Sequence, residues 1–67
     1  MTVLRTRRLE RGMSLTALAI AAQVQVSSLS RIERGQRCNQ ITAVRLAVAL
    51  GVPVRDVFVD YDRLRNF

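Results

Sequence analysis

The chain has 67 residues, a net charge of +6 and a hydrophobic content of 49%. A chain of this length forms one domain with one small core, which leaves little room for a catalytic pocket. It contains no His, one Cys and five acidic residues, so groups for acid–base catalysis and metal binding are scarce. We therefore expect no enzymatic activity, no cofactor and no metal site.

The charge is unevenly distributed along the chain, and all eleven basic residues are arginines. Residues 1–37 carry seven Arg against two Glu, a net charge of +5, whereas residues 38–67 carry four Arg against three Asp, a net charge of +1. A GC-rich genome would explain the use of Arg in place of Lys, but not this asymmetry. Positive charge gathered in one half of a small domain is typical of a face that binds nucleic-acid phosphates.

Cys38 is the single cysteine, so an internal disulfide is excluded and a reducing cytosol fits. A small, partly buried side chain is the favoured interpretation of Cys38, and a redox role is the alternative. The apolar runs are too short to span a membrane. We expect a cytoplasmic protein.

The first predicted helix covers residues 3–11, with Leu4 and Leu9 directed inward, and Gly12 ends it. Ser14 then has the character of a helix N-cap. The second helix is predicted over residues 15–22. Its apolar residues recur at helical spacing: Leu15, Leu18, Ala19 and Ala22.

A short break at residues 23–25 leads to a third helix over residues 26–34, with Leu29 and Ile32 on its apolar face. Gly35 is expected to close this helix in a left-handed conformation. Two short helices joined by a tight turn, the second polar on its outer face and framed by arginines, form the pattern of a helix-turn-helix that places one helix in a major groove.

A polar loop separates this unit from a fourth helix, which begins at residue 40 or 41 and ends at Leu50 before Gly51. Its residues expected to face inward are Val44, Ala47 and Leu50. Pro53 suits the first turn of a short fifth helix. Val54, Val57 and Phe58 would pin that helix to the core. Residues 59–67 are expected to extend it, to fray or to contact a partner.

The motifs of the chain resemble the Cro/repressor (Xre-type) helix-turn-helix family. The matching patterns are R-x-x-x-G-M-S at residues 8–14, L-A at 18–19, S-x-L-S-R-I-E-R-G at 27–35 and T-A-x-R-L-A-x-A-L-G-V at 42–52. The resemblance implies an all-α fold, a compact five-helix lambda-repressor-like domain whose second and third helices form the helix-turn-helix. This gives a DNA-binding domain over residues 1–58 and a tail over residues 59–67.

Three positions depart from the family pattern. Leu15 stands where the family often has a Gln that binds a phosphate and braces the third helix. Gln23 replaces the common Gly of the turn, so a non-Gly residue must take the left-handed conformation at some cost. Gln25 replaces the usual Ser or Thr that caps the third helix.

The expected base contacts come from the first turn and outer face of the third helix. They are Gln25, Val26, Ser27, Ser28 and Arg31. Arg31 is the best candidate for a bidentate contact with guanine, and a phosphate contact or a solvated arginine is the alternative. Gln25 suits an adenine or a backbone oxygen, and Val26 a thymine methyl group.

A second set of residues is expected to hold phosphates, which position the protein without specifying sequence. These residues are Ser14, Arg34, Gln36, Arg37 and Asn39. The resemblance also implies a partly buried ion pair between Arg8 and Glu33, with a structural role. Two unpaired surface charges are the alternative.

Together these features predict a sequence-specific regulator of transcription that binds double-stranded DNA, a repressor acting by promoter occlusion. We expect a homodimer on a pseudo-palindromic operator and no small-molecule effector. The resemblance also implies a protein of a bacterium or a phage-infected host, associated with the nucleoid. The candidate dimer contacts lie in the tail: Val59, Tyr61, Leu64 and Phe67. The alternatives are a protein-interaction module that keeps the fold without specific DNA binding, and an architectural DNA binder without sequence preference.

Overall fold

A computed structural model describes residues 2–58 of the chain, and Met1 and residues 59–67 lie outside this part. The described residues form helices only, in agreement with the predicted all-α fold. The five helices, in chain order, are α1 (Val3–Glu10), α2 (Leu15–Ala22), α3 (Val26–Glu33), α4 (Gln40–Leu50) and α5 (Val54–Val57). Their ends agree with the predicted ends to within one residue for α1 to α4.

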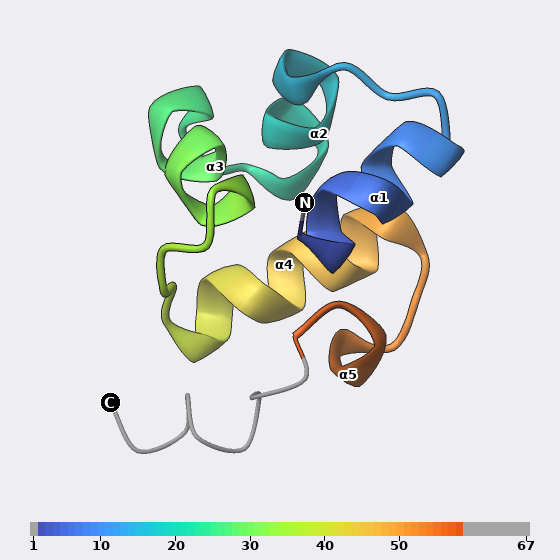
Figure 1. Ribbon diagram of the computed structural model, residues 1–67. Coiled ribbons are helices and arrows are strands. Elements are labelled where there is room, and N and C mark those ends of the chain that lie inside the picture. Colours follow the sequence, from blue (N-terminus) through green and yellow to red (C-terminus); the bar gives the residue numbers. More distant parts are fainter. Residues whose placement is uncertain (1, 59–67) are drawn as a thin grey trace.

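The helices enclose a small core, with α4 running beneath α2 and α3 and α5 closing the lower side (Figure 1). α2 packs against both α3 and α4, and α5 packs against α4 and α1. The second helix thus rests on the fourth, which is the longest, and the third packs against the second. The expected helix-turn-helix is present as a unit supported from one side.

Leucines from four helices fill the core, and alanines let the helices approach one another. The fully buried large side chains are Leu4, Leu18, Leu29, Leu46 and Leu50. Each contributes about 1.5–3 kcal/mol to folding when removed from water. The buried alanines are Ala19, Ala22, Ala43 and Ala47. A core of this kind needs no aromatic centre, and Phe58 packs against its edge.

Two residues predicted to face inward are exposed. Leu9 is 49% exposed because the inner face of α1 is set by Leu4 and Arg8, four residues apart, and Leu9 lies one position further round the helix. Val44 is 38% exposed because Ala43 and Ala47 take the inner positions of α4. Both predictions were wrong for the same reason: an apolar residue adjacent to the inner face was counted as part of it.

The start of α5 also differs from the prediction. Pro53 lies at the N-cap, with an extended backbone (φ −61°, ψ 144°), one residue before the helix and not in its first turn. Val57 is buried, and Val54 and Phe58 are half-buried. Val57 lies in the core cluster and Phe58 packs against it, as expected, whereas Val54 is not part of the cluster.

Helices α1 to α4 end in the same way, with one residue at positive φ that reverses the chain. The next backbone N–H then donates to a carbonyl five residues earlier, as from Val24 to Ala19 at 3.0 Å. Glycines fill three of the four reversing positions: Gly12, Gly35 and Gly51. Gln23, at the end of α2, fills the fourth, and within residues 2–58 it is the one non-Gly residue with positive φ (58°).

Candidate nucleic-acid interface

The α2–turn–α3 unit is built from two eight-residue helices and a turn of three residues. Ser14 caps α2, since its Oγ accepts the backbone N–H of Ala17 at 3.0 Å. Gln23 takes the left-handed conformation that the sequence required of it. Gln25 occupies the N-cap of α3, and its side chain makes no capping hydrogen bond. Its amide is therefore left for other partners.

α3 presents most of its predicted base-contacting residues to solvent. Leu29, Ile32 and Glu33 are buried on its inner face. The exposed members of the predicted set are Gln25, Val26, Ser27 and Arg31, and Ser28 is half-buried. Ser27 and Arg31 are four residues apart and therefore lie on one stripe. Arg31 forms no ion pair with any residue in the 2–58 range, so its guanidinium retains its donors.

The predicted phosphate-binding residues lie at helix ends or in the loop between α3 and α4. Ser14 and Asn39 are N-caps, and the Asn39 Oδ1 accepts the backbone N–H of Thr42 at 2.8 Å. Capping uses one oxygen of each, so the Ser14 hydroxyl and the Asn39 amide can still donate. Arg34 follows α3 directly, and Gln36 and Arg37 are exposed in the loop to α4.

An open hollow between α3 and α4 brings members of both predicted sets together. Its volume is about 210 Å³, and it is lined by Ser28, Arg31, Ile32, Gln36, Arg37, Cys38, Asn39 and Thr42. Two arginines and no carboxylate lie in this lining, so the hollow suits an anion. Three lining residues lie outside the predicted sets: Ile32, Cys38 and Thr42. Of these, Thr42, in the first turn of α4, offers a hydroxyl group that sequence reasoning missed. The sequence signal that could have identified Thr42 is its position three residues after Asn39, which caps α4.

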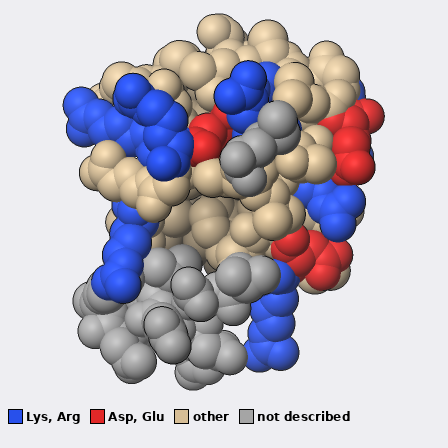
Figure 2. All heavy atoms as spheres, viewed as in Figure 1, with Lys and Arg blue, Asp and Glu red and all other residues tan. Residues whose placement is uncertain are grey.

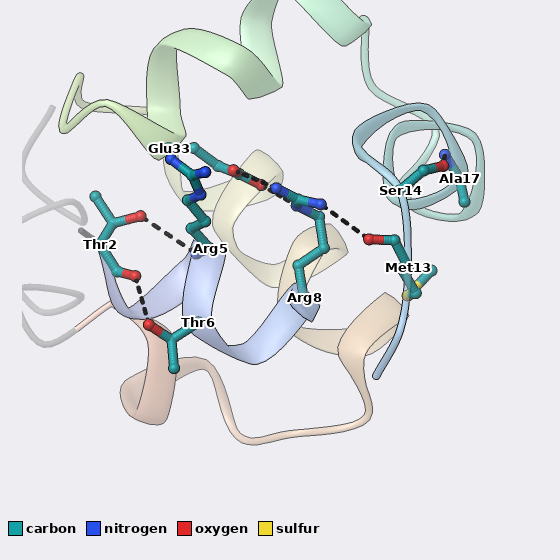
Figure 3. A network of polar contacts seen from close by, with 8 residues as sticks. All are labelled: Thr2, Arg5, Thr6, Arg8, Met13, Ser14, Ala17 and Glu33. Atoms are coloured by element: carbon teal, nitrogen blue, oxygen red, sulfur yellow. Dashed lines mark hydrogen bonds and ion pairs between the residues drawn. The ribbon is translucent and has the colours of Figure 1, made fainter. Parts of the chain in front are cut away.

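The ion pair between Arg8 and Glu33 is present and buried. Arg8 Nε donates to Glu33 Oε2 at 2.6 Å, and its Nη2 donates to Oε1 at 3.0 Å. The remaining Nη1 donates to the carbonyl of Met13 at 2.9 Å, as Figure 3 shows. The side chains are only 10% and 7% exposed. Hydrogen bonding to Glu33 raises the pKa of Arg8, against the opposing effect of burial.

This pair ties three segments together: α1, the loop before α2, and the end of α3 (Figure 3). A bidentate pair fixes the orientation of both side chains. It therefore holds α3 from its inner side while the outer side remains open. The prediction of a structural ion pair agrees with this geometry.

The positive charge is not spread over the helix-turn-helix itself. Residues 12–30, from Gly12 to Ser30, contain no charged side chain. The arginines flank this segment, in α1 and from Arg31 onward. In Figure 2, one cluster of basic side chains lies on the α3 side of the molecule with an acidic group beside it, and further basic and acidic side chains lie on the opposite side. The segment of residues 12–30 is thus neutral, with arginines on either side of it in the sequence.

Cys38 is half-buried and packs against the edge of the core. Burial raises the pKa of its thiol, so the thiol stays protonated at neutral pH. This is the behaviour of a small packing residue. Among residues 2–58, no group of three His, Cys, Asp or Glu side chains is placed to hold a metal ion. Nor is any helix in that range long and apolar enough to cross a membrane.

The fold and the exposed α3 define a DNA-binding module of the helix-turn-helix class. A protein-family model described as a helix-turn-helix domain matches residues 2–58, and the chain belongs to this family. The resemblance to Cro/repressor domains predicted from the motifs is thereby confirmed. No curated protein and no solved structure matches the chain.

Proposed function

We propose that this protein is a sequence-specific regulator of transcription that places α3 in the major groove of double-stranded DNA. The observation that carries the proposal is the exposed stripe of Ser27 and Arg31, beside a hollow lined by arginines, on a helix held from behind by Arg8 and Glu33. A rigid helix with free donors on its outer face meets the geometric requirement for base readout.

Each exposed residue of α3 has a role in this proposal. Arg31 donates two hydrogen bonds to O6 and N7 of a guanine. Gln25, whose amide is not used in capping, pairs with an adenine or a backbone oxygen. Val26, 39% exposed, contacts a thymine methyl group. Ser27 and Ser28 supply short donors, Ser27 to a base and Ser28 to a phosphate.

The phosphates are held on both sides of the groove. The N-terminus of α2 with Ser14 binds one backbone strand, since helix N-termini and hydroxyls offer donors to anions. The other contacts come from the segment after α3: Arg34, Gln36, Arg37 and Asn39. These contacts set the register of α3 without reading the sequence.

The protein acts by binding and not by catalysis. One α3 helix reads only a few base pairs, so specific binding uses two copies on a pseudo-palindromic operator. Bound across a promoter in the cytoplasm, such a dimer represses by excluding polymerase. The tail residues predicted as dimer contacts (59–67) lie outside the described residues.

Titration of a fluorescent duplex tests this function. The probe is a duplex selected by the protein from a random library, compared with a scrambled duplex at several salt concentrations. We expect Arg31→Ala to weaken binding to the selected duplex by about 1–3 kcal/mol and to relax preference at one base pair. Arg55→Ala, on α5, removes the same charge and serves as the control. Equal losses on both duplexes would make Arg31 a phosphate contact.

A protein-interaction module is the second candidate, and the uncharged segment 12–30 favours it, because a purely electrostatic DNA binder would carry charge there. The same titration distinguishes a DNA-binding regulator from a protein-interaction module. Selection that enriches no duplex, with no binding even at low salt, would reject DNA binding and leave the interaction module.

A further inference from the structure

The hollow between α3 and α4 has an exposed rim and a more buried floor. It opens where the chain passes from α3 to α4 (Figure 1), and its volume is about 210 Å³. Sites for drug-sized molecules have volumes of about 300–1,000 Å³, so this hollow suits a smaller ligand. The rim consists of the exposed lining residues: Arg31, Gln36, Arg37 and Asn39. The floor consists of the half-buried and buried ones: Ser28, Ile32, Cys38 and Thr42.

The lining carries positive charge and no negative charge. Arg31 and Arg37 supply guanidinium groups, and no Asp or Glu lines the hollow. Glu33, the acidic residue of α3, is bonded to Arg8, and its side chain is only 7% exposed. Because burial raises the pKa of the Cys38 thiol, that side chain adds no thiolate at neutral pH. The hollow therefore attracts anions, and its hydroxyl and amide groups donate hydrogen bonds to them.

The floor of the hollow distinguishes between two kinds of phosphate group. A phosphodiester of the DNA backbone carries a sugar on both sides and one negative charge, so it meets the rim more readily than the floor. A free phosphate ion, or the end of a phosphomonoester, carries up to about two negative charges and presents at least three open acceptor oxygens. Such a group fits between the arginines of the rim and the Thr42 hydroxyl on the floor.

We propose that the hollow binds a free phosphate group, as inorganic phosphate or as the end of a small phosphomonoester, and that this ligand competes with DNA. Arg31 lines the hollow and also lies on the exposed stripe with Ser27 that is proposed to read bases. Arg37 belongs both to the rim and to the proposed contacts with DNA phosphates. A dianion bound to both arginines neutralises charge that the DNA contact requires.

The competition with DNA rests on the proposed function, whereas phosphate binding to the free protein does not. The proposal also departs from the expectation, made from the sequence, that no small-molecule effector acts on this protein. A small ligand in an open site binds weakly, and we expect a dissociation constant of about 1 mM. At about 10 mM phosphate, the apparent affinity for DNA then falls about tenfold, because a competing ligand divides it by 1 + [L]/Kd. By linkage, DNA lowers the affinity for phosphate by the same factor.

NMR titration of the free full chain with sodium phosphate tests the site, with NaCl at equal ionic strength as the reference. We expect backbone amide shifts of residues 36–42 to saturate with phosphate and not with NaCl. Thr42→Val removes the hydroxyl and should raise the dissociation constant at least about fivefold, the effect of one lost hydrogen bond to a charged group. Thr16→Val, exposed on α2 and outside the lining, is the matched control and should leave it unchanged. Arg37→Ala, in the exposed loop, is a second test variant and should weaken binding at least as much.

Titration of the selected duplex tests the competition. Phosphate at about 10 mM should lower the affinity of the wild type for DNA about tenfold relative to NaCl at equal ionic strength. Thr42→Val should bind the duplex like the wild type when phosphate is absent, because a phosphodiester stays at the rim. It should lose most of the sensitivity to phosphate.

The outcomes separate the site, the competition and the proposed function. Amide shifts that NaCl reproduces, or phosphate binding that neither Thr42→Val nor Arg37→Ala weakens, would overturn the site. Saturable phosphate binding with no loss of DNA affinity beyond that in NaCl would overturn the competition. A wild type that binds no duplex would reject the proposed function and leave the phosphate titration of the free protein standing.

Discussion

At the scale of single residues, the pair of Arg8 and Glu33 decides how α3 is held. Each guanidinium nitrogen of Arg8 has a partner, two on Glu33 and one on the carbonyl of Met13. Burying a charge pair costs desolvation free energy. Removing one member of the pair leaves the charge of the other buried without a partner. The raised pKa of Arg8 means that its charge contributes to stability at neutral pH, and this contribution is lost as the pH rises into the strongly alkaline range.

We expect Glu33→Ala to lower the free energy of unfolding by about 3–5 kcal/mol, because the Arg8 charge then lies buried without a partner. Thermal and urea unfolding followed by circular dichroism measure this loss. The double change Arg8→Met/Glu33→Leu removes both charges and should cost much less than the single change.

The exposed pair of Arg7 and Glu10 provides the matched control, since its atoms are also 3.0 Å apart but its side chains are 41% and 56% exposed. Glu10→Ala should cost less than about 1 kcal/mol. Similar losses for Glu33→Ala and Glu10→Ala would contradict the structural role of the buried pair.

At the scale of elements, the turn between α2 and α3 is the junction within residues 2–58 that lacks both a glycine at positive φ and a side-chain cap on the following helix. α1, α3 and α4 each end in a glycine at positive φ, whereas α2 ends in Gln23 at φ 58°. A side chain in that conformation costs about 1–2 kcal/mol. α3 also begins without a side-chain cap at Gln25, unlike α2 and α4 with Ser14 and Asn39.

We expect Gln23→Gly to raise the free energy of unfolding by about 1 kcal/mol, because it relieves the left-handed strain. The measurement is urea unfolding of the variant and the wild type. Gln36→Gly places a glycine after α3 at negative φ and should destabilise the chain slightly through the entropy of its unfolded state. A Gln23→Gly variant less stable than the wild type would show that the turn does not keep this conformation in solution.

At the scale of the whole molecule, charge and contact surface are separated. The neutral segment of residues 12–30 supplies α2 and the first turn of α3, and the arginines lie on either side of it. Two of them, Arg7 and Arg8, are already paired with carboxylates. In the proposed function, the long-range attraction to DNA therefore depends on the arginines beside α3. The reading of bases would then depend on neutral side chains and on Arg31.

We expect Arg37→Ala to weaken binding to selected and scrambled duplexes alike and to reduce the slope of log K against log salt by about 1. The reason is that a phosphate contact releases counterions whatever the sequence. Titrations of both duplexes over a salt series measure the slope. A loss confined to the selected duplex would instead make Arg37 a base-reading residue.

The sequence by itself determined the helices, their caps and the class of the protein, because these depend on local periodicity and on side chains that bond within one turn. Ser14 and the strain at Gln23 were predictable for that reason. Only the tertiary structure decided that Leu9 and Val44 face solvent and that Thr42 joins Arg31 in one hollow. Such placements depend on how helices rotate against one another, and this rotation is set by packing between segments distant in the chain, which local patterns do not encode.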